Sequence, residues 1–239
     1  MSSNPIVWQP DATRIRESAM YQFMRQQGFD NYADLHQWSI DEAAAFWTAC
    51  SRFCNIAFDK AADAVLLRPD NIMDAGWFRG ARLNFAEHLL RHTGSESALV
   101  FCGEDGSRRE ISRDELRSSV ARLALSLRNS GVEKGDRVAG FLPNCPEAVM
   151  AMLATASIGA IWSSCSPDFG VNGVLDRFGQ IEPKVLFAVN AYLYNGKTCD
   201  TRASVASVVR AIPSLLQTVI VPFVDPVAAV AEIRNEISW

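Results

Sequence analysis

Two short apolar runs, separated by an alanine-rich segment, set the pattern in the middle of the chain. The runs cover 138–142 and 160–165, and Gly, Pro, Asn or Asp residues introduce or close each of them. Because neither run alternates polar with apolar residues, each is predicted to be a strand covered on both faces, as in a parallel sheet. The segment between them begins just after Pro146, which suits the first turn of a helix, and Cys145 or Asn144 is expected to cap it.

The beginning of the chain is predicted to be helical and irregular. Apolar residues recur at helical spacing over 15–23, before Gly28. Ser39 and Glu42 have the spacing of a capping box, which predicts a helix that starts after them and contains Trp47. These features indicate an α-helical cap.

A less regular stretch follows this first helical part. Over 55–83 the apolar residues are dispersed among Pro and Gly residues, which predicts an extended segment that crosses a surface and is held there by its aromatic side chains. Asn84 is then expected to cap a short helix that turns Phe85 and Leu89 inward. We place the end of the helical cap near residue 95.

A hairpin and a long helix are predicted next. The runs 98–102 and 108–111 are short and apolar or β-branched, and a Gly-containing turn separates them. Ser112 and Glu115 predict a second capping box. The helix that follows carries one apolar stripe, and Gly131 is expected to end it in the left-handed conformation.

Helices and strands alternate after the central unit. The predicted ranges are 172–179 (helix), 185–189 (strand), 201–212 (helix) and 218–223 (strand). This alternation predicts an α/β fold with a partial doubly wound, mainly parallel sheet flanked by helices. The residues after Asp225 are expected to be weakly helical, with Val230, Ile233 and Ile237 on one side.

The expected domain organisation is a helical cap over 1–95, followed over 96–239 by the first part of a larger α/β domain. The apolar ending at Trp239 suggests a chain cut short. An α/β sheet cut within its domain leaves an edge strand and an apolar face uncovered, so the isolated chain is expected to self-associate or to bind hydrophobic dyes.

Composition narrows the classes of function. The 239 residues include 23 basic and 27 acidic side chains, a net charge of −4, and no basic run is longer than Arg108-Arg109. This balance argues against a nucleic-acid surface. The longest apolar run, 148–162, is too short for the ~20 residues that a bilayer requires, and the first 20 residues lack the apolar core of a signal peptide, so no membrane partner is expected.

The cysteines indicate neither a disulfide framework nor a zinc site. They show no CxxC spacing and no neighbouring histidine cluster, and we expect reduced thiols in a cytoplasmic protein. The six positions are 50, 54, 102, 145, 165 and 199.

One segment comes close to a phosphate-binding loop. Residues 191–198, AYLYNGKT, miss the pattern GxxxxGK[ST] by one position, since Ala191 stands where the first glycine belongs. Tyr192 and Tyr194 would obstruct a close wrap of backbone amides around a triphosphate. Three interpretations remain: a nucleotide loop, a weaker anion site with Lys197 beside a helix N-terminus, and a solvated lysine in a turn.

A second candidate is the turn 163–170, SSCSPDFG, at the carboxyl end of a predicted buried strand. Ligands of open α/β sheets bind outside such ends. The alternative is an ordinary strand-to-helix turn with Asp168 as a local cap. The three histidines, His36, His88 and His92, lie near no candidate nucleophile, so the sequence predicts no catalytic residue and no metal ligand in this chain.

The stretch 131–162, GVEKGDRVAGFLPNCPEAVMAMLATASIGAIW, resembles the N-terminal subdomain of the acyl-adenylate-forming ligases. From Trp38 to Trp239 the chain is similar, more narrowly, to the acetoacetate–CoA ligase subfamily. Four stretches carry that resemblance: WFRGARLNFAEHLL at 77–90, WSSCSPDFG at 162–170, RFGQIEPKVLF at 177–187 and YLYNGK at 192–197.

The resemblance implies a two-step reaction of acetoacetate, ATP and CoA. The acid attacks the α-phosphate of ATP to form an acyl-adenylate and diphosphate, and the thiol of CoA then displaces AMP. Mg²⁺ and cationic donors offset the charge that accumulates as two anions approach. The family's phosphate loop, adenine contacts, metal ligand and catalytic lysine lie farther along a longer chain, and no stretch here matches them.

The resemblance also implies that this chain supplies half of a CoA site. Related acetyl-CoA synthetases use a Gly-rich turn, which corresponds to 166–170 here and places Asp168 where a glycine is expected. They also use two arginines, which correspond to Tyr194 and Lys197. Lys197 is therefore expected to meet a CoA phosphate, and Tyr194 to stack on the adenine.

Two other functions remain open from the sequence. One is part of an acetate–CoA or propionate–CoA ligase, because the acid pocket is formed by later residues. The other is a non-catalytic module that binds CoA or a protein partner. If the chain is instead part of an acetoacetate–CoA ligase, as the resemblance implies, the isolated chain is expected to be inactive.

Overall fold

The computed structural model describes residues 7–68, 70–225 and 236–239. The chain divides into two compact units, one that ends at Leu83 and one that begins at Asn84, and each is described by itself. Among the described residues, no helix combines the length and the apolarity that crossing a membrane requires.

Over its described residues, the first unit contains four helices and a pair of short strands. Aromatic and aliphatic side chains of the helical part enclose a small core around Phe23, Met24 and Leu35. The helical pattern over 15–23 is split in two because Ser18 accepts a hydrogen bond from the backbone N–H of Tyr21 and so caps a new helix. The helices are α1 (Ala12–Glu17), α2 (Ala19–Gln26), α3 (Tyr32–Asp41) and α4 (Ala43–Phe53).

The capping box predicted from Ser39 and Glu42 is wrong. Ser39 lies inside α3, where its hydroxyl donates to the carbonyl of His36 at 2.7 Å. Glu42 is the N-cap of α4, but no side chain hydrogen bonds there. The serine satisfies a carbonyl of the preceding helix instead of an amide of the next one, which the spacing alone does not reveal.

The stretch expected to be extended contains a small antiparallel pair, β1 (Ala64–Leu67) with β2 (Gly76–Arg79). Aromatic side chains hold it, as expected. Phe58 and Phe78 stack with ring centroids 5.7 Å apart, and Trp47 meets Trp77 edge-to-face at 6.1 Å. Strands of four residues are too short to give a clear period of two, so the sequence did not indicate the pairing.

The second unit begins with α5 (Phe85–Leu89), and the cap predicted at Asn84 is confirmed. The inward face is not the one expected, however. Phe85 and Leu89 are about half exposed, whereas Ala86 is fully buried. The helix has only five residues, and its buried side is the one that carries Ala86. The small alanine side chain allows a close approach of the helix to its neighbours.

The predicted hairpin and long helix are confirmed. β3 (Ser97–Cys102) pairs antiparallel with β4 (Arg108–Ser112). The capping box of Ser112 and Glu115 opens α6 (Arg113–Asn129), and Gly131 follows it with a φ of 81°.

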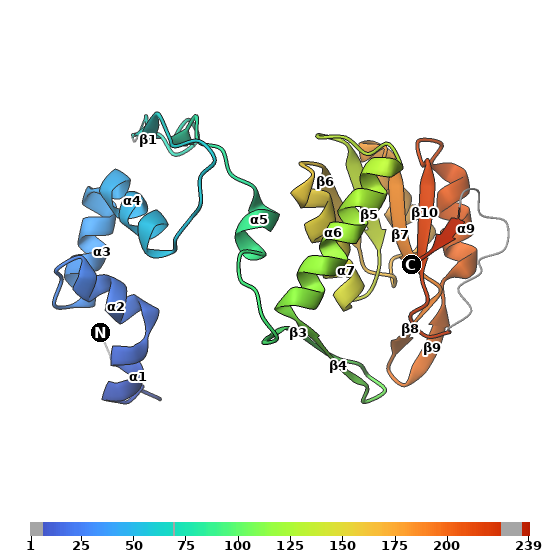
Figure 1. Cartoon of the computed structure of the whole chain (residues 1–239), viewed down its shortest axis with the longest axis horizontal. Coiled ribbons are helices and arrows are strands. Elements are labelled where there is room, and N and C mark those ends of the chain that lie inside the picture. Colours follow the sequence, from blue (N-terminus) through green and yellow to red (C-terminus); the bar gives the residue numbers. More distant parts are fainter. Residues whose placement is uncertain (1–6, 69, 226–235) are drawn as a thin grey trace, which may run out of the picture. The chain divides into compact units, whose positions relative to one another are not determined.

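A five-stranded parallel sheet forms the centre of this unit, so the predicted doubly wound α/β fold is confirmed (Figure 1). The strand order is β11-β10-β7-β5-β6. The elements are β5 (Arg137–Phe141), α7 (Pro146–Ser157), β6 (Ile161–Cys165), α8 (Val171–Ile181), β7 (Val185–Val189), α9 (Arg202–Ala211), β10 (Gln217–Val221) and β11 (Glu236–Ser238).

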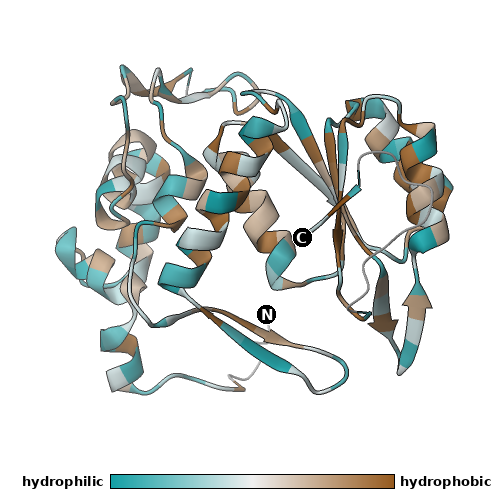
Figure 2. Ribbon diagram, turned by 45° about the vertical axis from the view of Figure 1, so that its right-hand side comes forward, coloured by the Kyte–Doolittle hydropathy of each residue, from teal (hydrophilic) through white to brown (hydrophobic). Residues whose placement is uncertain are grey.

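Helices cover both faces of the sheet. Successive strand residues point to opposite sides, so both faces carry apolar side chains that a helix layer buries. Val185 and Phe187 of β7 pack with α6 and α7, whereas Leu186 and Ala188 pack with α8 and α9. Figure 2 shows the apolar residues concentrated where these layers meet. Of the two runs expected to be covered on both faces, the one that forms β6 departs from the expectation, since β6 is an edge strand and Ile161 is 52% exposed.

The prediction for the last residues concerned a weak helix. Val230 and Ile233 lie outside the described residues. Ile237 lies in β11, a strand that pairs parallel with β10, so the helical prediction is wrong there. The parallel partner supplies the hydrogen bonds that the sequence could not show.

Candidate functional site at the carboxyl edge of the sheet

The connections of the sheet reverse direction between β5 and β7. α7, which follows β5, packs on one face of the sheet, and α9, which follows β7, packs on the other. The loops that leave these neighbouring strands therefore separate at the carboxyl edge. Ligands of open α/β sheets bind at such a switch point, which makes this edge the candidate site.

The segment that resembled a phosphate loop is a β-hairpin. β8 (Ala191–Tyr194) pairs antiparallel with β9 (Lys197–Asp200), and the two turn residues, Asn195 and Gly196, have φ values of 49° and 71°. The nucleotide-loop interpretation is therefore wrong. Asn-Gly between apolar residues is a strong hairpin signal, and it could have identified this turn from the sequence.

Lys197 opens strand β9 and does not lie at a helix N-terminus, because α9 begins only at Arg202. The interpretation as an anion site beside a helix end is therefore wrong as stated. Lys197 is exposed, and it forms no ion pair with any residue that the structure describes. Tyr194, its partner across the hairpin, is 65% exposed.

Asp168 lies in the turn between β6 and α8. It does not cap that helix, since Gly170 is the N-cap and no side chain hydrogen bonds there. The first amides of α8 are consequently left without a side-chain acceptor. The guanidinium of Arg177 lies over the ring of the neighbouring Phe169 in a cation–π contact, with Cζ 4.5 Å from the ring centroid.

This turn and the hairpin follow β6 and β7, so both leave the carboxyl edge of the parallel sheet. Burial raises the pKa of Tyr192 in β8, and a hydrogen bond with Cys199 and the negative charge of Asp168 raise it further. Asp168 therefore lies within electrostatic range of the hairpin that carries Tyr194 and Lys197. The three residues predicted from the sequence lie on two loops at the same edge of the sheet.

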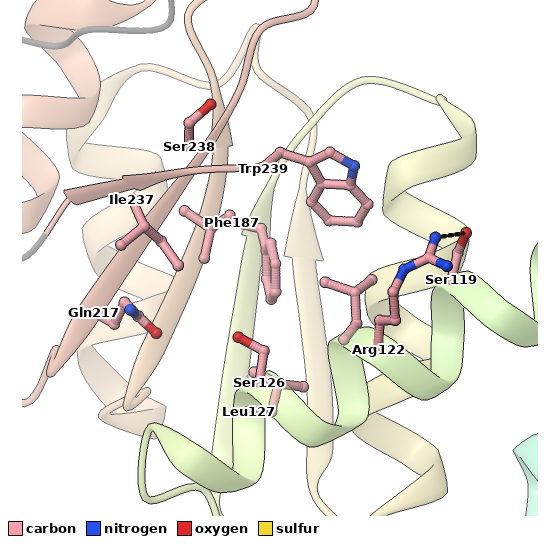
Figure 3. Close-up of a pocket in the computed structure, with 11 residues that line it drawn as sticks. Ser119, Arg122, Ser126, Leu127, Phe187, Gln217, Ile237, Ser238 and Trp239 are labelled. Atoms are coloured by element: carbon pink, nitrogen blue, oxygen red, sulfur yellow. Dashed lines mark hydrogen bonds between the residues drawn. The ribbon is translucent and has the colours of Figure 1, made fainter.

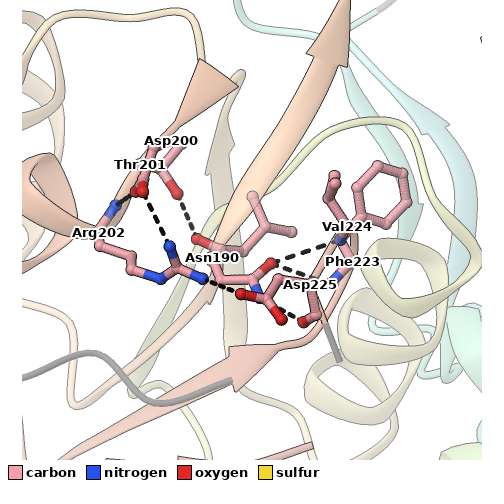
Figure 4. Close-up of polar contacts among 8 residues, drawn as sticks. Asn190, Asp200, Thr201, Arg202, Phe223, Val224 and Asp225 are labelled. Atoms are coloured by element: carbon pink, nitrogen blue, oxygen red, sulfur yellow. Dashed lines mark hydrogen bonds and ion pairs between the residues drawn. The ribbon is translucent and has the colours of Figure 1, made fainter. Parts of the chain in front are cut away.

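Asn190 was not predicted, and it forms several hydrogen bonds at this edge (Figure 4). It follows β7, is fully buried, and donates from Nδ2 to the carbonyl of Asp225 at 2.6 Å. Its Oδ1 accepts the backbone N–H of Phe223 at 3.2 Å. Its own carbonyl accepts the N–H of Thr201 at 3.1 Å. Asn190 thus links the end of β7 to the segment that follows β10 and to Thr201, the residue that follows the hairpin.

Arg202 adds an ionic connection at the same place. Its Nη1 lies 2.9 Å from the carboxylate of Asp200, and its Nη2 lies 2.6 Å from that of Asp225. Asp225 is the largest cause of a raised pKa for this guanidinium. The first residue of α9 therefore ties the hairpin to the segment that leaves β10.

A second ion pair lies at the N-terminus of α7. Arg109 of β4 forms two hydrogen bonds with Glu147, which is buried in the first turn of the helix. Arg109 also lies over the ring of Phe101, and that ring meets Phe223 edge-to-face at 6.0 Å. These contacts fix the β3–β4 hairpin against the carboxyl edge, where the residues between them line a cavity of about 290 Å³.

A separate cavity of about 250 Å³ lies against the face of the sheet that α6 covers (Figure 3). Phe187, Ile237 and Trp239 form its apolar floor, and Arg122 and Ser126 lie on its rim. The rings of Phe187 and Trp239 meet edge-to-face at 5.9 Å. None of its residues belongs to the loops of the carboxyl edge.

Chemically, the carboxyl edge is suited to binding. Among the residues that the structure describes, it offers the exposed ammonium of Lys197, the exposed ring of Tyr194 and the uncapped start of α8. Cys145, the N-cap of α7, is no nucleophile, because burial raises its thiol pKa to about 12. The arrangement can hold an anionic group, and it supplies no activated nucleophile among the residues just described.

Two family models match this sequence. The model described as AMP-binding enzyme matches residues 85–237, and the model described as acetyl-coenzyme A synthetase N-terminus matches residues 32–89. The first covers the central sheet up to Ile237 in β11, and the second covers the chain from α3 to α5.

Several curated proteins are similar to the chain. It is 46% identical over 237 residues to an acetoacetyl-coenzyme A synthetase of Rhizobium meliloti, covering 97% of this chain and 36% of that protein. It is 44% identical over 231 residues to the acetoacetyl-CoA synthetase of Mus musculus, covering 92% and 34%. A malonamoyl-CoA synthetase of Penicillium aethiopicum is 37% identical over 228 residues, covering 90% and 31%.

A solved structure is similar as well. The acetoacetyl-CoA synthetase from Streptomyces lividans superposes with a TM-score of 0.89 at 42% identity, covering 97% of this chain and 37% of that one. The chain thus spans about a third of the length of the proteins that it matches.

Proposed function

Because the chain belongs to the family of AMP-binding enzymes, we propose that it is the N-terminal part of an acetoacetate–CoA ligase. The complete enzyme converts acetoacetate, ATP and CoA to acetoacetyl-CoA, AMP and diphosphate. The observation that carries the proposal is 42–46% identity to acetoacetyl-CoA synthetases over more than nine-tenths of this chain. In domain terms, we propose a helical cap up to about residue 95 and the first part of the adenylate-forming domain after it.

The choice of acid is supported by the chemistry of the named relatives. Acetoacetyl and malonamoyl groups both carry a second carbonyl on the third carbon of the acid. Acetate and propionate lack it. A 3-oxo acid is therefore the substrate class that the similarities favour over the acetate or propionate alternative.

We assign this chain a share of the CoA site at the carboxyl edge. Lys197 would bind a phosphate of CoA through its ammonium, and the exposed ring of Tyr194 would stack on the adenine. The uncapped start of α8 offers backbone N–H groups to an anion. The carboxylate of Asp168 would repel a phosphate, so its role would be to accept a hydrogen bond from a neutral hydroxyl or amide of the coenzyme.

The proposed reaction also needs ATP and Mg²⁺, which we assign to residues beyond this chain. Within 7–68, 70–225 and 236–239 no three His, Cys, Asp or Glu side chains are grouped to hold a metal ion. The donors present fit a thiol coenzyme better than a metal–triphosphate. We further propose a cytoplasmic location, which the six free thiols support.

The acid specificity is tested by acid-dependent ATP–pyrophosphate exchange, run with acetoacetate and with acetate on this chain and on any longer product of the same reading frame. We expect exchange from the longer form alone, with preference for acetoacetate. Exchange by this chain unaided, or a preference for acetate, would contradict the proposal.

The CoA site is tested by calorimetric titration of CoA into the chain and its Lys197→Glu variant. Reversing this charge should weaken binding at least about tenfold, since a charge-assisted contact becomes a repulsive one. Lys134→Glu is the matched control, because Lys134 lies in the loop before β5, at the other end of that strand. Equal affinities in all three proteins would remove Lys197 from the site.

A further inference from the structure

The β8–β9 hairpin has little to hold it in place by itself. It consists of two strands of four residues, and these pair only with each other in the part of the chain that the structure describes. An isolated two-stranded hairpin is marginally stable in water. A fixed position for Lys197 therefore has to come from the base of the hairpin.

Buried hydrogen bonds close that base. Asn190 and Thr201, which flank the hairpin, are 0% and 3% exposed and are joined by a backbone hydrogen bond of 3.1 Å. The Thr201 hydroxyl donates to the carbonyl of Val189, at the end of β7. The amide of Asn190 reaches across to Phe223 and Asp225. The hairpin is therefore attached to the ends of both β7 and β10.

Arg202 fixes the outer side of the base. Its guanidinium is shared between Asp200, the last residue of the hairpin, and Asp225, which follows β10. A planar guanidinium restrains the angle between two carboxylates, whereas a lysine ammonium is a point charge without that geometry. The backbone N–H of Arg202 also donates to Asp200 at 2.8 Å.

We propose that Asn190 and Arg202 are positioning residues that hold the β8–β9 hairpin in place and thereby set the affinity of Lys197 for CoA. The coenzyme part of this inference rests on the proposed function. In this proposal Asn190 and Arg202 do not bind the coenzyme themselves. Both act through the hairpin, and loosening its base lowers the fraction of molecules in which Lys197 and Tyr194 face the ligand together.

Arg202→Met is the sharpest variant, because it removes the guanidinium from a partly exposed position without altering the core. Arg210→Met is its matched control on the same helix, since Arg210 is exposed and forms no ion pair with any described residue. Arg202→Lys keeps the positive charge but removes the planar guanidinium, so it tests whether that geometry matters. Asp225→Asn removes the negative charge of the partner while keeping nearly the same side-chain shape.

The first measurement is hydrogen exchange of peptides that cover 190–200, followed by mass spectrometry. We expect Arg202→Met to speed exchange in the hairpin about three- to tenfold, with an intermediate effect for Arg202→Lys and no effect for Arg210→Met. Unchanged exchange in both Arg202→Met and Asp225→Asn would overturn the positioning role.

The second measurement is the CoA affinity in a double-mutant cycle with Lys197→Glu. Arg202→Met should weaken CoA binding about three- to tenfold in the native background and clearly less once Lys197 is reversed, because only the contact of Tyr194 then remains to be lost. A loss of the same size in both backgrounds would show a merely structural role and overturn the inference.

The two hypotheses fail separately. If the native chain binds no CoA, the proposed coenzyme site is wrong and the coenzyme part of the inference falls with it. The exchange measurement still decides whether Arg202 and its partner Asp225 hold the hairpin, because that measurement uses no ligand. Asn190→Ala, measured in the same way, decides the role of Asn190.

Discussion

Arg109 and Glu147 face each other through two parallel hydrogen bonds, Nη1 to Oε1 at 2.8 Å and Nη2 to Oε2 at 2.9 Å. The carboxylate side chain is 11% exposed, whereas the arginine is 44% exposed. Glu147 also lies in the first turn of α7, where a negative charge is favoured by the helix dipole. The pair therefore joins the β3–β4 hairpin to α7 through a contact in which the carboxylate is mostly buried.

Removing Arg109 should destabilise the second unit. In Arg109→Met the buried carboxylate of Glu147 loses its partner, and we expect a loss of about 2 kcal/mol in the free energy of unfolding. Arg108→Met is the control, because Arg108 pairs with Glu110 in an exposed position and should cost less than about 0.5 kcal/mol. Urea denaturation measures both, and equal midpoints for the two variants would contradict the assignment.

The contact between Asp136 and Lys184 predicts a dependence of stability on pH. The hydrogen bond from Lys184 at 2.6 Å lowers the pKa of Asp136 below its ordinary value. A carboxylate with a lowered folded-state pKa contributes stability above its unfolded pKa of about 3.9, and the contribution disappears as the pH falls through the folded-state value.

We therefore expect Asp136→Asn to be less stable than the native chain at pH 7, by about 1 kcal/mol. The difference between the two proteins should shrink as the pH falls below about 4. Thermal unfolding followed at pH 7, 5, 4 and 3 measures it. A difference that stays constant over this range would show that the charge of Asp136 contributes nothing.

Gly140 of β5 predicts a steric effect. A Cβ at this position would lie 2.5 and 2.6 Å from two ring atoms of Trp162 on the neighbouring strand. Gly140→Ala should cost about 1–3 kcal/mol, because a packed indole has to move. Gly179→Ala in α8 should instead stabilise the chain by about 0.5–1 kcal/mol, since its Cβ meets nothing within 4 Å and helix interiors disfavour glycine.

Opposite signs for these two glycine substitutions are the decisive result. Both add one methyl group, so any general effect of alanine is common to them. A destabilised Gly179→Ala, or a neutral Gly140→Ala, would count against the packing described for the sheet.

The thiols should differ widely in reactivity. Cys145 has a pKa raised to about 12 by burial, so at pH 8 only about one molecule in ten thousand carries its thiolate. Cys54 and Cys102 are exposed. Iodoacetamide labelling followed by peptide mass spectrometry should modify these two rapidly and Cys145 only after unfolding. Rapid labelling of Cys145 in the folded chain would show that the switch point is open to solvent.

The edge strand β6 predicts association of the isolated chain. Ile161 is 52% exposed on a strand whose outer side pairs with no other strand in the described residues. Light scattering should show a mass that rises with concentration, and Ile161→Lys should suppress the rise because a charge on an edge opposes pairing. Leu125→Lys, at a 59% exposed position of α6, is the control and should leave association unchanged.

Much of the fold could be predicted because its signals are local. The apolar runs of β5 and β7, the start of α7 at Pro146 and the capping box of Ser112 and Glu115 each depend on neighbours within one or two turns of chain. Where the signals were weak, the expectations failed. Ser39 has hydrogen-bonding alternatives within its own helix, and the four-residue strands β1 and β8 are too short for a period to emerge.

The candidate site could be predicted only in part. Asp168 and Lys197 stood out as polar residues in turns next to apolar runs, and both of their loops follow strands at the carboxyl edge of the sheet. Asn190 gave no signal, because the sequence around a single asparagine after a strand does not show whether its side chain is solvated or buried. Its partners lie 33–35 residues away, and no local pattern records them.

The amino-acid sequence by itself determined the order of helices and strands from β3 to β7, the parallel character of the sheet and the residues that start α6 and α7. The periodicity of apolar side chains and the hydrogen bonds of helix caps involve residues only a few positions apart. They can therefore be recognised in the amino-acid sequence alone. The tertiary structure alone decided that β6 is an edge, that 236–238 form a strand and that Asn190 and Arg202 hold the hairpin. Those outcomes depend on which distant segments exclude water from one another, and that is settled only when the chain is folded.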